Sequence, residues 1–275
     1  MKKLAQYMQF VNKYGPCALV AGGSDGLGAA FAEALARRGL NLVLIARNKA
    51  RLDETAKRIR DKYSVDVSVI TCDLAYYENA KNLIQEHICA DKNNSYGASI
   101  GILVYNAAFA PIGLFENTDE ESLSLAAAVN VRTPLLLTKF LSAQMIQNRR
   151  GGIVLMSSLA GAQGSPNLAA YAATKSFNAV LAEGLWKELK PHGVDVIGCC
   201  AGAVLTPGYQ QAEKVKKAPG TLPAKEVAEQ TLKALGKGPV VIPGTINKIA
   251  RFVLTRLLTR KAAINIMSNN TGNLL

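Results

Sequence analysis

Short apolar runs alternate with longer stretches of helical periodicity along most of the chain, and this alternation constrains the fold more than any other feature. Strands are expected at 17–23, 41–47, 66–74, 99–108, 151–158, 193–200 and 239–243. Helices are expected at 26–39, 48–62, 76–90, 119–149, 168–190 and 223–236. Strands that are apolar throughout and separated by helices indicate a parallel sheet covered on both faces. We therefore predict an α/β fold with a single doubly wound parallel sheet of about seven strands.

The 275 residues contain no internal repeat, low-complexity segment or interdomain linker. We predict one domain over 1–275, with an N-terminal arm at 1–15 and a basic amphipathic C-terminal tail at 245–275. The composition, 49% hydrophobic and 19% charged, excludes a disordered chain. Uncharged apolar runs fall short of the roughly 20 residues that span a bilayer. The first ten residues lack a signal peptide's apolar stretch, so a cytoplasmic location is expected.

The five cysteines are odd in number and lack CxxC spacing, so neither a disulfide framework nor a metal site is expected. The net charge of +12 favours anionic partners such as nucleotide phosphates, acyl carriers or an anionic membrane surface. Seven lysines and arginines, and no acidic residue, lie between 230 and 275. Aromatic residues do not interleave these cations as stacking platforms would, so nucleic acid is not expected as a partner.

The sequence AGGSDGLG lies between the first predicted strand and the first predicted helix. Its glycines allow a tight turn and a close approach of backbone N–H groups to a pyrophosphate, and the helix N-terminus favours negative charge. Many plain turns share this spacing, but at the first strand–helix junction of such a sheet it favours nucleotide binding. The candidate cofactor contacts are Gly22, Ser24, Asp25, Gly26, Leu27 and Gly28.

Arg47 ends the second strand, where an acidic residue would bind the 2′-hydroxyl of NAD. An arginine there suits a 2′-phosphate, so NADP(H) is favoured over NAD(H), although a solvated surface arginine is the alternative. Asp73, followed by Leu74, either caps the next turn or accepts from the adenine amino group. Asn106, followed by Ala107, is likewise either a turn residue or a cofactor contact.

The stretch SSLAGAQGSPNLAAYAATK, at 157–175, contains a further constellation. Tyr171 and Lys175 are four residues apart, so they share one face of a helix. A nearby ammonium would lower the tyrosine pKa toward a range useful for proton transfer. Ser158, at the end of the fifth strand, could stabilise charge on a substrate carbonyl oxygen. The alternative is an ordinary amphipathic helix, but the serine and the upstream glycine turn favour a proton-transfer site.

With these landmarks in order, residues 15–243 resemble the short-chain dehydrogenase/reductase family, which has a Rossmann-like fold. They are most similar to its 3-ketoacyl reductase and 17β-hydroxysteroid dehydrogenase branch. The resemblance implies that Tyr171 exchanges a proton with the carbonyl oxygen, Ser158 holds that oxygen, and Lys175 lowers the tyrosine pKa and binds the nicotinamide ribose. It implies that Asn130 supports a proton-relaying water, and that Val204 and Thr206 contact the nicotinamide carboxamide.

The chain departs from the family pattern at several cofactor-side positions. Tyr105 and Ala108 replace the first asparagine and the glycine of the NNAG motif, Ala201 replaces the proline of a PG loop, and Ala21 replaces a threonine. The four catalytic positions are unchanged. We therefore expect altered packing near the cofactor and an active, NADP-dependent enzyme acting on CH–OH or C=O groups.

Substrate identity is expected to depend on 203–222, 107–118 and the tail. The branch resemblance favours a hydrophobic ketone or a long acyl thioester. The basic tail could pack as a helix pair, contact a second subunit, cover the cleft or lie on an anionic membrane. A homodimer or homotetramer, paired through 119–149 and 168–190, is expected. The alternative function is a catalytically silent, NADPH-binding regulatory or membrane-associated protein.

Overall fold

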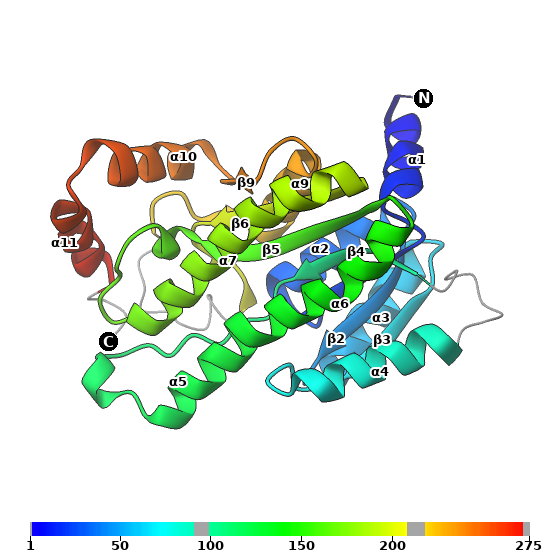
Figure 1. Cartoon of the computed structure of the whole chain (residues 1–275), viewed down its shortest axis with the longest axis horizontal. Helices are drawn as coiled ribbons and strands as arrows, with labels where there is room; N and C mark the ends of the chain where they lie inside the picture. The colour runs from blue at the N-terminus through cyan, green and yellow to red at the C-terminus, as the bar shows by residue number, and fades with distance from the viewer. Residues whose placement is uncertain (1, 91–98, 208–217, 272–275) are drawn as a thin grey trace.

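The computed structural model describes residues 2–90, 99–207 and 218–271. Its centre is a sheet of seven parallel strands in the order β3-β2-β1-β4-β5-β6-β9 (Figure 1). The strands are β1 Cys17–Ala21, β2 Asn41–Ala46, β3 Val67–Thr71, β4 Ile100–Tyr105, β5 Gly151–Ser158, β6 Val194–Ala201 and β9 Val240–Val241. The strand order reverses beside β1, where β4 crosses to the other side. The predicted doubly wound, Rossmann-like sheet is confirmed.

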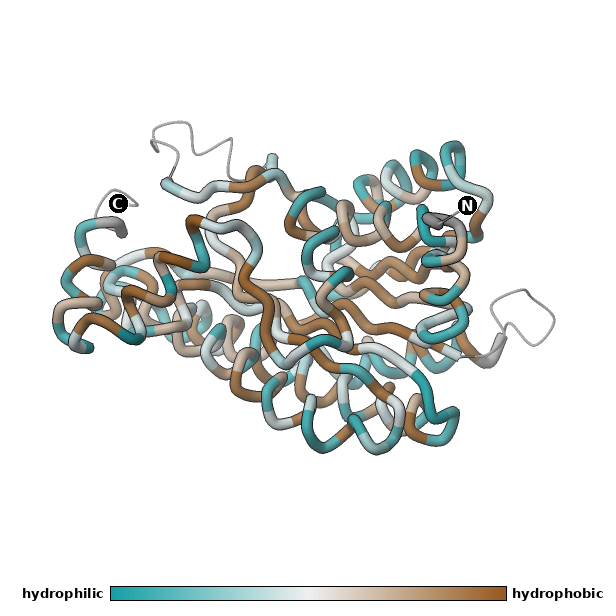
Figure 2. The backbone as a smooth tube through the Cα atoms, turned by 90° about the horizontal axis from the view of Figure 1, so that it is seen from above, coloured by the Kyte–Doolittle hydropathy of each residue, from teal (hydrophilic) through white to brown (hydrophobic). Residues whose placement is uncertain are grey.

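Helices cover both faces of the sheet. One face packs against α2 Gly26–Ala36, α3 Lys49–Lys62 and α9 Ala224–Ala234, and the other against α4 Tyr77–Ala90, α6 Thr133–Gln147 and α7 Ala169–Leu189. In β1, Ala18 and Val20 enter the first core while Leu19 and Ala21 enter the second, and all four side chains are fully buried. Because both faces are covered, the strands lack polar alternation. Figure 2 shows the hydrophobic strands between more hydrophilic helices.

The predicted N-terminal arm is a helix, α1 Lys2–Tyr14, at the edge where the strands begin (Figure 1). Its last residue, Tyr14, is buried, and its hydroxyl donates to Asp195 Oδ2 at 2.6 Å. The carboxylate of Asp195 also pairs with Lys13. These contacts attach the arm to β6, at the edge opposite to the one where ligands bind in doubly wound sheets.

The helix expected over 119–149 runs without a gap from Glu120 to Gln147, but one turn within it is π-helical. It consists of α5 Glu120–Ala127, a π-helical turn η2 Ala128–Arg132, and α6. Pro134, near the start of α6, has no N–H to donate to the carbonyl of Asn130 four residues earlier. That carbonyl instead accepts from Asn178 Nδ2 at 2.9 Å. Pro134 is visible in the sequence, and it is the physical reason for the π-helical turn within the expected helix.

The segment after β6 forms a second, two-stranded parallel sheet from β7 Val204–Leu205 and β8 Leu222–Pro223, where no strand was expected. The tail forms α10 Thr245–Phe252, a π-helical turn η5 Val253–Leu257, and α11 Arg260–Thr271. The expected substrate-determining segment 203–222 and the tail lie partly outside the described residues, at 208–217 and 272–275. Within the described ranges, no helix is long and apolar enough to cross a membrane.

Four cysteines in the described parts of the chain are buried and form no disulfide; these are Cys17, Cys72, Cys199 and Cys200. Over those same residues, no group of His, Cys, Asp and Glu side chains could hold a metal ion. The side chain of Cys89 lies outside the described residues.

Candidate active site

The candidate residues follow the carboxyl ends of β1, β2, β3, β4, β5 and β6, so the fold gathers them along one edge of the sheet. The glycine turn follows β1, and Ser158 ends β5. The first turn of α7 carries Tyr171, and the π turn η2 carries Asn130. Figure 1 shows the strands ending toward the side of the molecule that also carries α10 and α11.

The glycine turn is packed so closely that side chains are excluded. A Cβ on Gly28 would lie 1.8 Å from the Gly22 carbonyl oxygen, and a Cβ on Gly22 would lie 2.7 Å from the Ala107 nitrogen. Gly22 also has φ +80°, a left-handed conformation that favours glycine. Asp25 caps α2 by accepting from Gly26 N at 2.6 Å. The turn therefore presents backbone to any group lying above it, as a phosphate cradle does.

A cavity of about 560 Å³ adjoins this turn. Its lining includes seven of the predicted cofactor contacts: Gly22, Ser24, Arg47, Asp73, Leu74, Asn106 and Ala107. Leu27 instead packs against the core cluster beside α2, and Val204 packs against the same cluster. Thr206 lies next to Gly26, whose added Cβ would be 3.0 Å from Thr206 Cγ2. The structure thus brings seven of the predicted contacts to one hollow, and the others, Leu27 among them, do not line it.

Two guanidinium groups border the cavity. Arg47 is 66% exposed, and its Nη1 lies 3.9 Å from Asp73 Oδ2. Arg51, 57% exposed, places its Nη1 3.3 Å from Asp25 Oδ2. Sequence reasoning missed Arg51, although it follows Arg47 by one helical turn's spacing at the start of α3. Asp73 also accepts from Ala75 N at 2.9 Å, so the capping alternative for this residue is realised.

The residues that line this cavity suit a nicotinamide dinucleotide. The glycine turn supplies a backbone cradle that a Cβ would fill, and two arginines supply charge for an additional phosphate. The Asn106 side chain donates to Gly22 O at 3.3 Å and holds the end of β4 against the turn.

Ser158, Tyr171 and Lys175 form a connected group. The hydroxyl groups of Ser158 and Tyr171 are hydrogen-bonded to each other. Ser158 Oγ also accepts from Ala160 N at 3.2 Å. Lys175 is 3% exposed, and its Nζ lies 5.5 Å from the Tyr171 ring centroid and donates to Met156 O at 3.0 Å. The predicted serine, tyrosine and lysine are therefore neighbours.

The electrostatics of this group differ from the expectation. Burial raises the pKa of Tyr171, while the hydrogen bond from Ser158 acts in the opposite direction. Burial lowers the pKa of Lys175 to about 8, against a smaller opposing effect of Cys199. The expected lowering of the tyrosine pKa by the ammonium is not seen. The reason is that Lys175 Nζ is directed to a backbone carbonyl, and desolvation dominates both groups.

Asn130 is fully buried, and its side chain makes three hydrogen bonds. Its amide donates to Phe109 O at 2.7 Å and to Thr174 Oγ1 at 3.1 Å, and its Oδ1 accepts from Phe109 N at 2.8 Å. The side chain thus joins the segment after β4 to α7. The Tyr105 hydroxyl, also buried, donates to Val129 O at 2.6 Å. This contact ties the end of β4 to the π turn η2, at the position where tyrosine replaces the family's usual asparagine.

Comparison with known proteins identifies the family of the chain. Residues 16–217 match the family model described as short chain dehydrogenase. A 7beta-hydroxysteroid dehydrogenase of Clostridium sardiniense is 29% identical over 88% of this chain and 90% of its own. A very-long-chain 3-oxoacyl-CoA reductase of Phaeosphaeria nodorum is 29% identical over 93% of this chain and 75% of its own length. An inactive hydroxysteroid dehydrogenase-like protein 1 of Pongo abelii is 33% identical over 70% of this chain and 57% of its own length.

Solved structures agree as well. One concerned with 7beta-hydroxysteroid dehydrogenase stereoselectivity superposes with a TM-score of 0.84 at 27% identity, covering 94% of this chain and 98% of that one. A short-chain dehydrogenase from Sphingobium yanoikuyae in complex with NADPH gives 0.73 at 30% identity, covering 83% and 87%. The chain belongs to the short-chain dehydrogenase family, in the branch of ketoacyl reductases and hydroxysteroid dehydrogenases, and is an oxidoreductase acting on carbonyl and alcohol groups.

Proposed function

We propose that this oxidoreductase uses NADP(H) to interconvert a hydrophobic ketone, or a 3-oxoacyl-type carbonyl, and its alcohol. The observation that carries the proposal is the hydrogen-bonded pair of Ser158 and Tyr171 with the buried Lys175 beside it. A nicotinamide cofactor, when bound, supplies or accepts the hydride. The chain's own residues then hold the carbonyl oxygen and move the proton.

Tyr171 is proposed as the proton donor in the direction of reduction. Because burial raises its pKa, the phenol is protonated at neutral pH and can donate to a carbonyl oxygen that gains charge. Ser158 shares a hydrogen bond with Tyr171, so its hydroxyl is placed to bind that same oxygen. Asn130 is proposed as a positioning residue that holds α7 and the segment after β4 in place.

Lys175 is proposed to take part in proton transfer to Tyr171. With a pKa of about 8, the buried amine exists in both protonation states near neutral pH. It can therefore return a proton toward Tyr171 after each reduction, or bind the ribose of the cofactor. Val204 and Thr206 are proposed contacts for the nicotinamide end, which is supported by the position of Thr206 beside Gly26.

The preference for NADP(H) is proposed from Arg47 and Arg51. Both line the same cavity, and no acidic residue occupies position 47, at the end of β2. Arg47 Nη1 lies 3.9 Å from Asp73 Oδ2, and Arg51 Nη1 lies 3.3 Å from Asp25 Oδ2. Exposed ion pairs of this kind contribute little free energy, so each guanidinium can leave its carboxylate and bind a phosphate instead.

The cofactor proposal is tested by titrating the protein with NADPH and NADH, and repeating this on Arg47→Ala and Arg51→Ala. Each substitution is expected to weaken NADPH binding about tenfold and to leave NADH binding unchanged, because a charge-assisted hydrogen bond contributes about 1.5–3 kcal/mol. Arg58→Ala is the matched control, since Arg58 is an exposed arginine of the same helix that does not line the cavity. Equal losses for both nucleotides would contradict the proposal.

The substrate class is proposed from the relatives and from the surface around the site. The named relatives act on hydroxysteroids and very-long-chain 3-oxoacyl-CoA, so a bulky apolar ketone or an acyl thioester is the expected substrate. The segment after β4 exposes Ile112, Leu114 and Phe115, which agrees with an apolar substrate.

Pairing of subunits through α5, α6 and α7 remains a prediction, and the exposed Leu135 and Val180 of α6 and α7 support it.

A silent, NADPH-binding regulatory role is the second candidate, favoured by the relative named as inactive. The two candidates differ in whether Tyr171 matters. For an enzyme, Tyr171→Phe abolishes turnover and leaves NADPH binding intact; for a sensor, the substitution changes neither binding nor the cellular effect.

A further inference from the structure

Helix α10 presents its apolar side chains outward. Ile246, Ile249 and Phe252 are 59%, 59% and 57% exposed, and their spacing of three residues puts them on one stripe of the helix. In the π turn that follows, Leu257 is 65% exposed. These are large side chains to leave in water, and they form one group.

Two polar side chains of α10, those of Asn247 and Arg251, point the other way, into the protein. Asn247 is 3% exposed and donates to Gly220 O at 3.0 Å and Pro243 O at 2.9 Å. Arg251 donates to Cys200 Sγ at 3.3 Å. A surface helix normally buries its apolar face, so this orientation is inverted. The contacts of Asn247 and Arg251 hold it in that inverted orientation.

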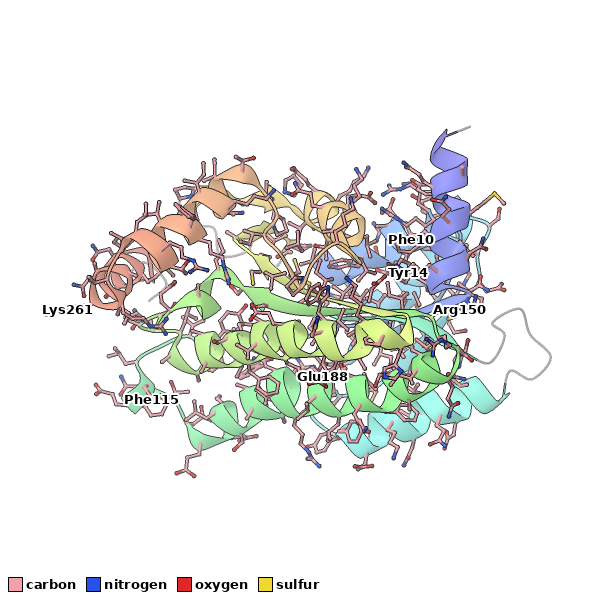
Figure 3. The ribbon with its side chains drawn as sticks, turned by 45° about the horizontal axis from the view of Figure 1, so that its top comes forward. Phe10, Tyr14, Phe115, Arg150, Glu188 and Lys261 are labelled. Carbon is pink, nitrogen blue, oxygen red and sulfur yellow. The ribbon has the colours of Figure 1, made fainter. Side chains whose placement is uncertain are left out.

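This helix lies beside the candidate active site. It packs against η3 Leu159–Ala162, which begins directly after Ser158. The second exposed apolar group, Ile112, Leu114 and Phe115, lies at the same end of the molecule. Figure 3 shows Phe115 at that end together with Lys261 at the start of α11. Apolar side chains therefore lie on more than one side of the edge where substrate must enter.

The charges around α10 indicate what covers it. Lys248, Arg256, Arg260 and Lys261 are exposed, and the sequence has no acidic residue from 230 onward. A symmetric contact with a second copy through this surface would bring the same cations together without a carboxylate from this segment. An anionic lipid surface would satisfy both the apolar stripe and the cations.

We propose that α10 and the turn η5 dock on an anionic membrane surface, with Ile246, Ile249, Phe252 and Leu257 inserted at the headgroup boundary. The carboxyl edge of the sheet then faces the lipid, so an apolar substrate can pass from the bilayer to the site without crossing water. The docking itself does not depend on the proposed cofactor preference, and NADPH binding measured on the same proteins tests that preference separately.

The test is flotation of the full chain with vesicles of phosphatidylcholine alone and of equal parts phosphatidylcholine and phosphatidylserine. Binding is expected for the mixed vesicles and is expected to fall with added salt. Ile246→Ser/Ile249→Ser/Phe252→Ser should reduce partitioning at least about tenfold. Tyr76→Ser/Met8→Ser is the apolar control, because these side chains are 68% and 61% exposed elsewhere on the molecule.

A second comparison separates local docking from the overall charge. Lys248→Gln/Arg256→Gln/Lys261→Gln should reduce partitioning roughly a hundredfold, since each cation near an anionic surface contributes about fivefold. Lys225→Gln/Lys233→Gln/Lys237→Gln removes the same charge from exposed lysines near α1, and it should have little effect. Equal losses for the two triple variants, or no vesicle binding by the wild type, would overturn the proposal. So would an apolar variant that binds normally but dissociates an oligomer in sedimentation.

Discussion

The buried amine of Lys175 allows a quantitative prediction, because the free-energy cost of burying it in its charged form depends on pH. Its pKa is lowered from 10.5 to about 8 in the folded protein by burial. Below pH 8 the amine is charged in both states, and the folded state bears the full desolvation cost of about 3 kcal/mol. As the pH rises from 8 to 10.5, the folded state loses its proton first. The unfolded state then binds more protons, so stability rises with pH over this window.

Lys175→Met replaces the amine with an apolar side chain of similar length and removes this cost at every pH. The lost hydrogen bond to Met156 O offsets part of the gain by a roughly constant 1–3 kcal/mol. The stability of the variant relative to wild type should therefore decrease by about 2 kcal/mol between pH 7 and pH 9.5. For a chain of this size, that corresponds to a change of about 4–8 °C in the difference between the two melting temperatures.

The assay is thermal or urea unfolding of both proteins at the two pH values, without cofactor. Lys187→Met is the matched control, because Lys187 is an exposed lysine of the same helix, and its difference from wild type should not depend on pH. Lys175→Met should also lose turnover, so the substitution would remove the cost of burying the amine and abolish activity at the same time. A difference between Lys175→Met and wild type that is the same at both pH values would refute the reasoning.

Two further predictions concern the cofactor side. Gly28→Ala should reduce nucleotide affinity at least about tenfold and lower the melting temperature, because its Cβ would lie 1.8 Å from the Gly22 oxygen. Gly184→Ala, where the added Cβ on α7 meets nothing within 4 Å, should instead stabilise the protein by about 0.5–1 kcal/mol. Tyr105→Phe should destabilise by about 1–3 kcal/mol in urea unfolding, because the buried Val129 carbonyl loses its donor. If Tyr105→Phe is neutral, the tyrosine fills space without holding the π turn.

Much of the architecture follows from the apolar runs alone. A parallel strand that is buried on both faces has to be continuously apolar, so the seven strands of the sheet and the helices between them are readable as blocks. Because the buried strands are apolar throughout, the polar residues at their ends stand out in the sequence. The core does not require these polar residues, so they mark the site. The short strands β7 and β8 have only two residues each and leave no such signal.

Other features depend on contacts that periodicity does not encode. The helical spacing of Ile246, Ile249 and Phe252 predicts an apolar face, but not whether it faces the core or the solvent. That depends in part on the hydrogen bond from Asn247 to Gly220, which is 27 residues away in sequence. The direction of the Lys175 ammonium likewise depends on the Met156 carbonyl, which is 19 residues away in sequence. Pro134 is the exception, because its missing N–H could have been used to predict the irregular turn around Asn130.

The assignment of Tyr171 as the proton donor is tested by following NADPH oxidation with a panel of bulky apolar ketones and 3-oxoacyl thioesters, for the wild type and for Tyr171→Phe. The wild type is expected to turn over at least one panel member, faster with NADPH than with NADH. Tyr171→Phe should lower kcat at least about a hundredfold, with NADPH affinity unchanged. Turnover by Tyr171→Phe at the wild-type rate would contradict the assignment of the proton donor, and with it the proposed mechanism.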